Sequence, residues 1–192
     1  MAARHLGISG EKPVLLVFGG SKGARSINFA VMNSLRGLLQ KFEIVHIVGE
    51  TDWLAVRNSR EQLPVDLAAR YHALPYLHEM GAAYAAADLV VSRAGASVLG
   101  EYPVFGLPAV LVPYPHAWRY QKVNAEYLAY RGAAVILEDH RLNSELVVTL
   151  NVLLENKNKM KSMRAAMFEL SHPRAAEKIA SALIQLAGAK SL

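Results

Sequence analysis

The sequence has 192 residues, of which 53% are hydrophobic and 19% are charged, and its formal net charge is +5. These proportions predict one globular domain with a substantial core, and they exclude a disordered or fibrous chain. The chain contains no cysteine, which excludes disulfides and thiol chemistry, and its basic residues form no aromatic-rich stripe, so nucleic acid is not an expected partner.

In chain order, short apolar runs alternate with stretches of helical periodicity, and after residue 138 only helical patterns follow. This alternation predicts an α/β protein with a doubly wound parallel sheet of about six strands and with helices at its C-terminal end. A short helix capped by Thr51 or Asp52 is expected after the second strand. The predicted strands are residues 14–18, 42–48, 71–76, 88–93, 109–114 and 133–137, and the longer predicted helices are residues 24–39, 80–87, 144–155, 157–170 and 174–186.

The most informative stretch is residues 88–124. Its first strand runs into Arg93-Ala94-Gly95-Ala96-Ser97, a loop whose glycine lets backbone approach a ligand and whose serine is expected to cap the next helix. Glu101 lies one turn along that helix, which Pro103 is expected to shorten or kink. Gln121 and Asn124 share one side of the first turn of the helix after the next strand. The carboxyl ends of parallel strands meet in one crevice, so these groups predict a nucleotide-sugar site.

Two further observations concern location and metals. No apolar run approaches the roughly 20 residues of a membrane-spanning helix, and residues 1–13 lack the apolar core of a secretory signal. A cytoplasmic location is therefore expected. The histidines show no metal-ligand spacing and no paired acidic motif is present, so no metal cofactor is expected.

Four short segments resemble the carboxyl-terminal, donor-binding half of the MurG family of glycosyltransferases. Each segment alone is weak evidence, because glycine-rich turns after strands are common, but their order and spacing extend over more than half of the chain. The resemblance implies a Rossmann-like domain at residues 13–188, one half of a two-domain GT-B glycosyltransferase, with residues 1–12 as an N-terminal connector. The segments are Gly19-Gly20-Ser21-Lys22-Gly23-Ala24, Tyr76-Leu77-His78-Glu79-Met80, Ser92-Arg93-Ala94-Gly95-Ala96 with Glu101, and Gln121-Lys122-Val123-Asn124-Ala125.

The resemblance assigns roles around the diphosphate and the ribose. In this family the glutamate that matches Glu101 binds the ribose hydroxyls, as a carboxylate accepting two O–H bonds would. The backbone N–H groups of Gly95 and Ala96 are expected to face the diphosphate. Ser21 is the polar side chain of the glycine-rich loop that is expected near the diphosphate and the acceptor. Arg93 is expected either to contact the ligand or to form a structural ion pair.

The resemblance also assigns both ends of the donor. Gln121 and Asn124 match the pair that reads the sugar. The backbone at Leu77 is expected to pair with the uracil edge, and Met80 is expected to pack nearby or to belong to the core. Three residues depart from those usual in the family, and their effect on sugar recognition stays open: Lys22, Val98 and Tyr120.

Together these implications describe the donor-binding half of an inverting, metal-independent transferase in peptidoglycan synthesis. It would move N-acetylglucosamine from UDP-N-acetylglucosamine to the lipid-linked muramyl-pentapeptide (lipid I to lipid II). The acceptor site and the general base are expected in an N-terminal half, as a domain or a partner chain, so no catalytic residue is assigned here. The full enzyme is expected on the cytoplasmic face of the cell membrane. The alternatives are a subunit of a two-chain transferase, a transferase for another lipid or aglycone, and a non-catalytic nucleotide-sugar-binding module.

Overall fold

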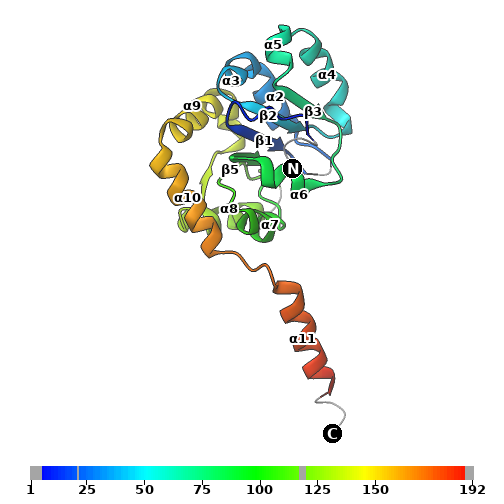
Figure 1. The fold of residues 1–192 in the computed structure, drawn as a ribbon, viewed down its shortest axis with the longest axis vertical. Coiled ribbons are helices and arrows are strands. Elements are labelled where there is room, and N and C mark those ends of the chain that lie inside the picture. The colour runs from blue at the N-terminus through cyan, green and yellow to red at the C-terminus, as the bar shows by residue number, and fades with distance from the viewer. Residues whose placement is uncertain (1–5, 21, 117–119, 189–192) are drawn as a thin grey trace.

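The computed structural model of the chain describes residues 6–20, 22–116 and 120–188. Its strands are β1 (Val14–Phe18), β2 (Glu43–Ile47), β3 (Tyr71–Leu74), β4 (Leu89–Ser92), β5 (Ala109–Leu111) and β6 (Ala134–Ile136). They form one six-stranded parallel sheet in the order β3-β2-β1-β4-β5-β6 (Figure 1). Each predicted strand is present, and the doubly wound α/β fold is confirmed.

Apart from β1, the observed strands are shorter than the predicted ones, most clearly at β5. This strand ends at Leu111, three residues before its predicted end at 114. The Val112 N–H still bonds the Ser92 carbonyl, at 2.8 Å. Pro113 has no amide hydrogen, so it cannot continue the ladder. The chain leaves the sheet here and enters the loop that reaches the candidate site.

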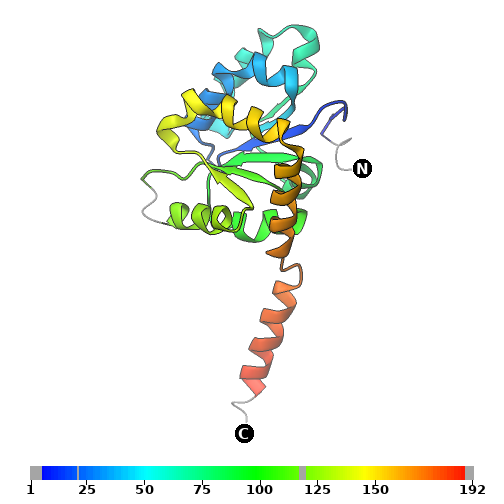
Figure 2. The same cartoon turned by 90° about the vertical axis from the view of Figure 1, so that its left-hand side faces the viewer.

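Helices cover both faces of the sheet, as Figure 2 shows. The helices α2, α3, α4 and α9 pack on one face, and α6, α7 and α8 pack on the other. The helix α10 contributes a buried methionine to the core on each side. The helices are α2 (Arg25–Asn33), α3 (Leu35–Lys41), α4 (Trp53–Glu61), α5 (Val65–Ala68), α6 (Met80–Ala86), α7 (Val98–Phe105), α8 (Tyr120–Tyr130), α9 (Leu142–Glu155), α10 (Lys157–Glu169) and α11 (Ala175–Gly188), with short 3₁₀ turns η1 (Glu50–Asp52) and η2 (Asp139–Arg141).

The prediction of a single helix over residues 24–39 is wrong. The structure has two helices, which break at Ser34, where φ is −111° and ψ is 6°. The apolar spacing continues through the break, so periodicity alone cannot reveal it. Asn33 and Ser34 explain the break, because short polar side chains compete for backbone hydrogen bonds and disfavour a helix interior.

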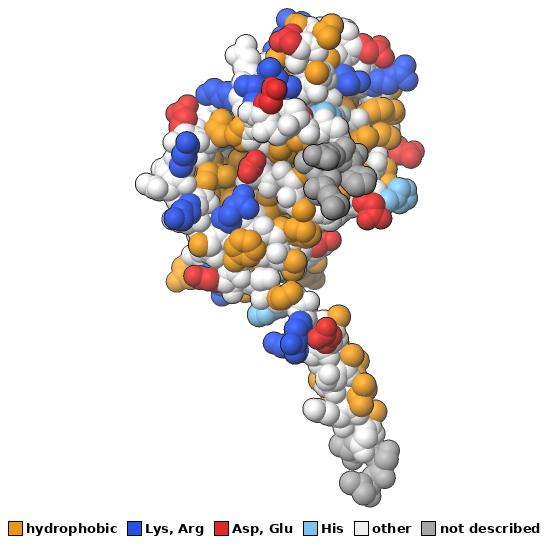
Figure 3. Space-filling view, in the orientation of Figure 1, with side chains coloured by type: hydrophobic (Ala, Val, Ile, Leu, Met, Phe, Trp, Pro, Cys, Tyr) orange, Lys and Arg blue, Asp and Glu red, His pale blue; other side chains and the backbone are white. Residues whose placement is uncertain are grey.

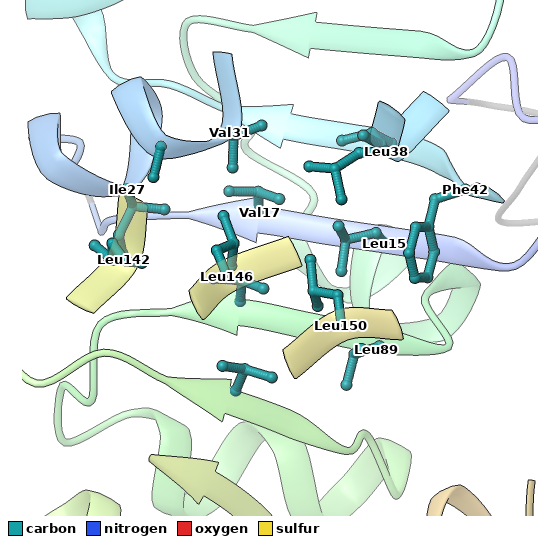
Figure 4. Packing of buried hydrophobic residues seen from close by; sticks show 14 of the residues in the cluster. Leu15, Val17, Ile27, Val31, Leu38, Phe42, Leu89, Leu142, Leu146 and Leu150 are labelled. Carbon is teal, nitrogen blue, oxygen red and sulfur yellow. The ribbon is translucent and has the colours of Figure 1, made fainter. Parts of the chain in front are cut away.

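Alternate residues of the central strands fill the two core layers. Leu15 and Val17 of β1 pack in the core layer under α2, α3 and α9. Figure 4 shows Val17 near Ile27, Val31 and Leu146, and Leu15 near Leu38, Phe42 and Leu150. The intervening residues of the same strand point to the opposite core. A strand that is buried on both faces reads as a continuous apolar run, which is why β1 was predictable to the residue.

A buried polar network joins β2, β3 and α2. The Tyr71 hydroxyl lies 2.7 Å from His46 Nδ1, and His46 Nε2 lies 3.0 Å from Asn28 Oδ1. Asn28 Nδ2 donates to the Val48 carbonyl and to Asp52, both at 2.9 Å. Because the Asn28 amide nitrogen is used as a donor, its oxygen is the acceptor, so His46 carries its proton on Nε2. The network ties the loop after β2 to α2.

The segment before β1 packs against the sheet. Ile8 is buried in one core layer. The Glu43 carboxylate accepts hydrogen bonds from the Ser9 N–H at 2.8 Å and from the Ser9 hydroxyl at 2.9 Å, and it pairs with His72 Nε2 at 2.9 Å. Burial raises the pKa of Glu43, but these hydrogen bonds and one from Gly10 outweigh burial and lower the pKa overall. Residues 8–10 of the predicted connector are therefore held at the amino ends of β2 and β3.

The last helix, α11, projects away from the rest of the molecule in both ribbon views (Figures 1 and 2). Its apolar side chains are exposed, and Figure 3 shows hydrophobic atoms along the projecting segment. None of the helices in the described part of the chain is both long and apolar enough to span a membrane. The exposed apolar residues of α11 are Ile179, Leu183, Ile184 and Leu186.

Candidate functional site

A cleft opens at the carboxyl ends of β1 and β4, where the strand order reverses. Open α/β sheets bind ligands at this point. A larger hollow of about 840 Å³ is lined by the loops after β1, β4 and β5. A smaller hollow of about 190 Å³ lies beside it, between the loop after β3 and the helices α6 and α7. Both hollows are lined by Phe18, Gly20 and Ser97, so they are two compartments of one cleft.

The glycine-rich loop after β1 is built by close backbone contact. A Cβ atom on Gly23, whose φ is +76°, would lie 2.2 Å from the Val48 carbonyl oxygen. A Cβ atom on Gly49, whose φ is +84°, would lie 2.6 Å from the Gly23 nitrogen. The loops after β1 and β2 therefore touch backbone to backbone. Lys22 lines the larger hollow, whereas the predicted site residue Ser21 lies outside the described residues.

The loop before α7 presents free backbone N–H groups to the cleft. In the described part of the chain, no hydrogen bond is formed by the N–H groups of Gly95, Ala96 and Ser97. Gly95 lines the larger hollow, and a Cβ atom added to it would meet nothing within 4 Å. This geometry leaves room for a ligand that accepts hydrogen bonds at the positive end of α7.

The expectation that Ser97 caps α7 with its side chain is wrong. Ser97 stands at the N-cap position, but its φ of −62° and ψ of −26° are helical and its side chain makes no capping bond. The helix instead begins with tight turns, in which the Val98 N–H bonds the Gly95 carbonyl at 3.3 Å. Because the backbone is already helical at Ser97, the hydroxyl cannot fold back on the first turn as a cap would.

Glu101 lies on α7 at the smaller hollow. The residue is exposed, and its Oε2 accepts a hydrogen bond of 3.0 Å from the Tyr84 hydroxyl. Burial raises the pKa of Tyr84, and the nearby Glu101 carboxylate raises it further, so the phenol stays a donor. One carboxylate oxygen is thus fixed, while the other has no hydrogen bond within the described residues. The helix around it is short, as expected, since it ends at Gly106, whose φ is +56°.

The smaller hollow has apolar walls. Leu77 and Met80 line it together with Phe18, Ile47 and Tyr76. Met80 is half-buried and packs against the core while it also lines the hollow, so the core role is present and packing beside a base stays a prediction. Within the described residues, the backbone N–H and carbonyl of Leu77 form no hydrogen bond. The hollow therefore combines apolar surface with one unpaired backbone donor and one unpaired acceptor.

Arg93 is engaged in an ion pair inside the larger hollow. Its Nη1 lies 2.5 Å from Asp139 Oδ1 and also donates to the Val112 carbonyl at 3.2 Å. Its Nη2 donates to the Ser26 hydroxyl at 2.8 Å. Of the two roles expected for Arg93, the structural ion pair is present, while the residue still lines the cleft. Sequence reasoning missed Ser26 and Asp139, because neither belongs to a motif and both lie far from Arg93 along the chain.

The two amide side chains of α8 bond to the backbone through opposite ends, Gln121 through its oxygen and Asn124 through its nitrogen. Gln121 lines the larger hollow, and its Oε1 accepts a hydrogen bond of 2.9 Å from the Tyr114 N–H. Asn124 Nδ2 donates to the Ala94 carbonyl at 3.0 Å. A bound oxygen leaves the Gln121 nitrogen as a free donor, and a bound nitrogen leaves the Asn124 oxygen as a free acceptor. Gln121 therefore offers a donor to the larger hollow, whereas Asn124 offers an acceptor but is not among the residues that line either hollow.

The charge of the larger hollow is mainly positive. Lys22, Arg25 and Arg93 line it together with the single carboxylate of Asp139. Because Asp139 is paired with Arg93, the remaining cations and the free N–H groups favour an anion. Over the described ranges, no cluster of three or more His, Asp or Glu side chains could hold a metal ion.

Comparisons with known proteins agree with this geometry. Residues 14–179 match the model of the glycosyltransferase family 28 C-terminal domain. The chain is 39% identical, over 97% of its length, to a protein of Chlorobium limicola named UDP-N-acetylglucosamine--N-acetylmuramyl-(pentapeptide) pyrophosphoryl-undecaprenol N-acetylglucosamine transferase, of which it covers 50%. It is 42% identical, over 91% of its length, to a protein of the same name from Roseiflexus sp. strain RS-1, of which it covers 44%.

A solved structure shows the same relation. The crystal structure of Acinetobacter baumannii MurG superposes on 96% of this chain with a TM-score of 0.79 and 29% sequence identity. The superposition covers 52% of that protein. The chain thus spans about half the length of the relatives that it matches.

Proposed function

Because this chain belongs to glycosyltransferase family 28, whose C-terminal domain it matches, we propose that it binds UDP-N-acetylglucosamine as the donor half of a transferase. The printed name of the relatives supports N-acetylglucosamine as the sugar and an undecaprenol-linked muramyl-pentapeptide as the acceptor. The chain spans half of those relatives, so the acceptor site and general base belong to an N-terminal half, as a domain or a partner chain. A lipid-linked acceptor would bring the complete protein to the cytoplasmic face of the membrane.

The nucleoside would occupy the smaller hollow. Its apolar walls suit a flat base, and the unpaired backbone N–H and carbonyl at Leu77 can pair with the uracil edge, which has both acceptors and a donor. Met80 would pack against the base. Glu101 lines this hollow from the first turn of α7, and its oxygen that is not bonded to Tyr84 can accept hydrogen bonds from the ribose hydroxyls.

The diphosphate would lie across the N-terminal end of α7. The free N–H groups of Gly95 and Ala96 point to an anion there, and the helix dipole adds to their effect. Lys22 and Arg25 supply positive charge from the opposite wall of the same hollow. We propose that these groups also stabilise the UDP leaving group, which gains negative charge as the bond to the sugar breaks.

The sugar would contact α8. Gln121 offers N–H donors and Asn124 offers a carbonyl acceptor, as their backbone partners dictate. Neutral amides of opposite polarity fit the hydroxyls and the acetamido group of a neutral hexosamine. In the reaction, the acceptor hydroxyl attacks the anomeric carbon, its proton passes to a base in the other half of the enzyme, and the bond to UDP breaks with inversion.

One observation carries the proposal: the Glu101 carboxylate lines an apolar hollow that adjoins, at Ser97, the loop with the unpaired amide groups. The test is calorimetry on the 192-residue chain with UDP, UDP-N-acetylglucosamine and NAD. We expect UDP and the sugar nucleotide to bind, with or without EDTA, and NAD not to bind. Binding of NAD without UDP would contradict the nucleotide-sugar assignment, and loss of UDP binding in EDTA would contradict a metal-independent site.

The amides give a second test with an internal control. Gln121→Ala and Asn124→Ala are each expected to raise the dissociation constant of UDP-N-acetylglucosamine by about tenfold, the equivalent of one lost hydrogen bond. The dissociation constant of UDP is expected to stay unchanged. Equal losses of affinity for both ligands would indicate that the two residues contact the nucleotide and not the sugar. Robust transfer to the lipid acceptor by this chain alone would contradict the assignment of the general base to another half.

A further inference from the structure

A cluster of three polar side chains closes the base of the larger hollow. Asp139 Oδ1 accepts a hydrogen bond of 2.6 Å from the Ser26 hydroxyl as well as the ion pair from Arg93. Arg93 completes the triangle by donating to Ser26. The Arg93 side chain is 10% exposed and that of Asp139 is 22% exposed. The cluster joins the start of α2, the end of β4 and the 3₁₀ turn after β6, three segments that are distant in sequence.

The cluster reaches the loop after β5 at two points. Arg93 Nη1 donates to the Val112 carbonyl, at the start of that loop. The guanidinium also lies over the Tyr114 ring, with Cζ 5.1 Å from the ring centroid. A cation over the face of an aromatic ring is attracted by the ring's electrons, and this attraction is stronger where water is excluded. Arg93 therefore fixes the direction in which Tyr114 leaves the sheet.

Tyr114 in turn orients Gln121. Its N–H donates to Gln121 Oε1, which leaves the amide nitrogen as the free end of a side chain that lines the hollow. If the loop moved, the Gln121 amide would lose its fixed partner and could rotate. We propose that Asp139 is a positioning residue for the sugar end of the cleft and holds the Gln121 amide in place through Arg93 and Tyr114. This inference rests on the proposed function, since it concerns the same donor sugar.

The expected consequence of losing Asp139 is specific to the sugar. Without the carboxylate, Arg93 keeps only Ser26 and the Val112 carbonyl, and its unpaired charge turns toward the anion-binding side of the hollow. Binding of the diphosphate is then maintained, whereas the guanidinium no longer holds the Tyr114 ring in its present direction. The ratio of UDP to UDP-N-acetylglucosamine dissociation constants reports this loss, because a change in overall folding affects both ligands alike.

The experiment is calorimetry with both ligands on the wild-type chain and on Asp139→Ala, Asp139→Asn and Gln121→Ala. Asp139→Ala is expected to lower the dissociation-constant ratio by about tenfold, as Gln121→Ala does, since both remove one fixed hydrogen bond to the sugar. Asp139→Asn keeps an acceptor oxygen for Arg93 and Ser26, so it is expected to lower the dissociation-constant ratio by less than Asp139→Ala does. The control is Glu138→Gln, which removes the exposed neighbouring carboxylate and is expected to keep the wild-type ratio.

Coupling distinguishes positioning from a separate contact. Tyr114→Leu removes the aromatic face, and the double variant with Asp139→Ala is expected to lose no more than either single variant. If the double variant lost the sum of what the two single variants lose in sugar binding, the proposal would be overturned. It would also be overturned if Asp139→Ala kept the wild-type dissociation-constant ratio while Gln121→Ala lowered that ratio. Equal weakening of both ligands in Asp139→Ala and in Asp139→Asn would also overturn it. If the wild-type chain binds neither ligand, the proposed function fails first and this inference with it.

Discussion

Lowering the pH from 7.5 to 5 is expected to destabilise the fold by about 2 kcal/mol through His46 alone. His46 is completely buried, and both ring nitrogens are engaged, one with the Tyr71 hydroxyl and one with Asn28. Burial lowers the pKa of His46 from 6.5 to about 3. The folded protein therefore holds this imidazole neutral over a pH range in which the unfolded chain protonates it.

The sign and size follow from this difference. A group whose pKa is depressed in the folded state contributes stability above its unfolded pKa, and that stability falls as the pH drops from 6.5 toward about 3. Each pH unit below 6.5 removes about 1.4 kcal/mol, so pH 5 removes about 2 kcal/mol. The lowered pKa of Glu43 acts at more acidic pH, below its ordinary value of 4.5, and does not contribute in this window.

The assay is urea unfolding followed by circular dichroism at pH 7.5, 6.5, 5.5 and 5 in constant salt, on the wild type and on His46→Gln. The variant is expected to be less stable at pH 7.5, because it disturbs the bonds to Tyr71 and Asn28, and to lose less stability than the wild type between pH 7.5 and 5. An equal pH dependence in the two proteins would refute the assignment to His46. So would a wild-type protein whose stability is constant down to pH 5.

Four other substitutions test the site and the core. Glu101→Gln keeps an acceptor for Tyr84 but loses the charge, so the UDP dissociation constant should rise about tenfold, while that of 2′,3′-dideoxy-UDP should not change. Gly95→Ala should change the free energy of unfolding by less than about 0.5 kcal/mol, because its Cβ would meet nothing within 4 Å. The same variant should bind UDP measurably more weakly by calorimetry. Gly23→Ala should destabilise by more than about 2 kcal/mol in urea unfolding, because its Cβ would lie 2.2 Å from the Val48 oxygen and its φ is +76°. Leu150→Ala should cost about 2–5 kcal/mol in the same assay; a cost below that range would contradict the close packing of α9 on the sheet.

The parallel sheet was predictable because its strands are buried on both faces. The run at residues 14–18 matches β1 to the residue, since each of its side chains enters one of the two core layers. The alternation of strands and helices also fixed where the cleft had to lie, at the carboxyl ends of the strands. Glu101, Gln121 and Gly95 were therefore placed near one another from sequence order alone, and the structure brings them to the same cleft.

Other features depend on partners that no local pattern reveals. Ser26 and Asp139 are 113 positions apart and meet only because α2 and the turn after β6 lie at the same end of the sheet. The polarity of Gln121 and Asn124 depends on the backbone groups of Tyr114 and Ala94, which pattern reading does not pair with them. The break at Ser34 was missed for the opposite reason, because a regular apolar spacing continued through it.

The contact between Gly23 and Gly49 determines which wall of the cleft can move. A Cβ atom on Gly49 would meet the Gly23 backbone, and one on Gly23 would meet the Val48 carbonyl oxygen and the Gly49 Cα. The two loops therefore pack with no room for a side chain between them. Binding then requires no ordering of the contact itself, and the associated loss of conformational entropy is avoided. If the cleft closes over the proposed donor, we expect this wall to stay unchanged and the parts that face it to move.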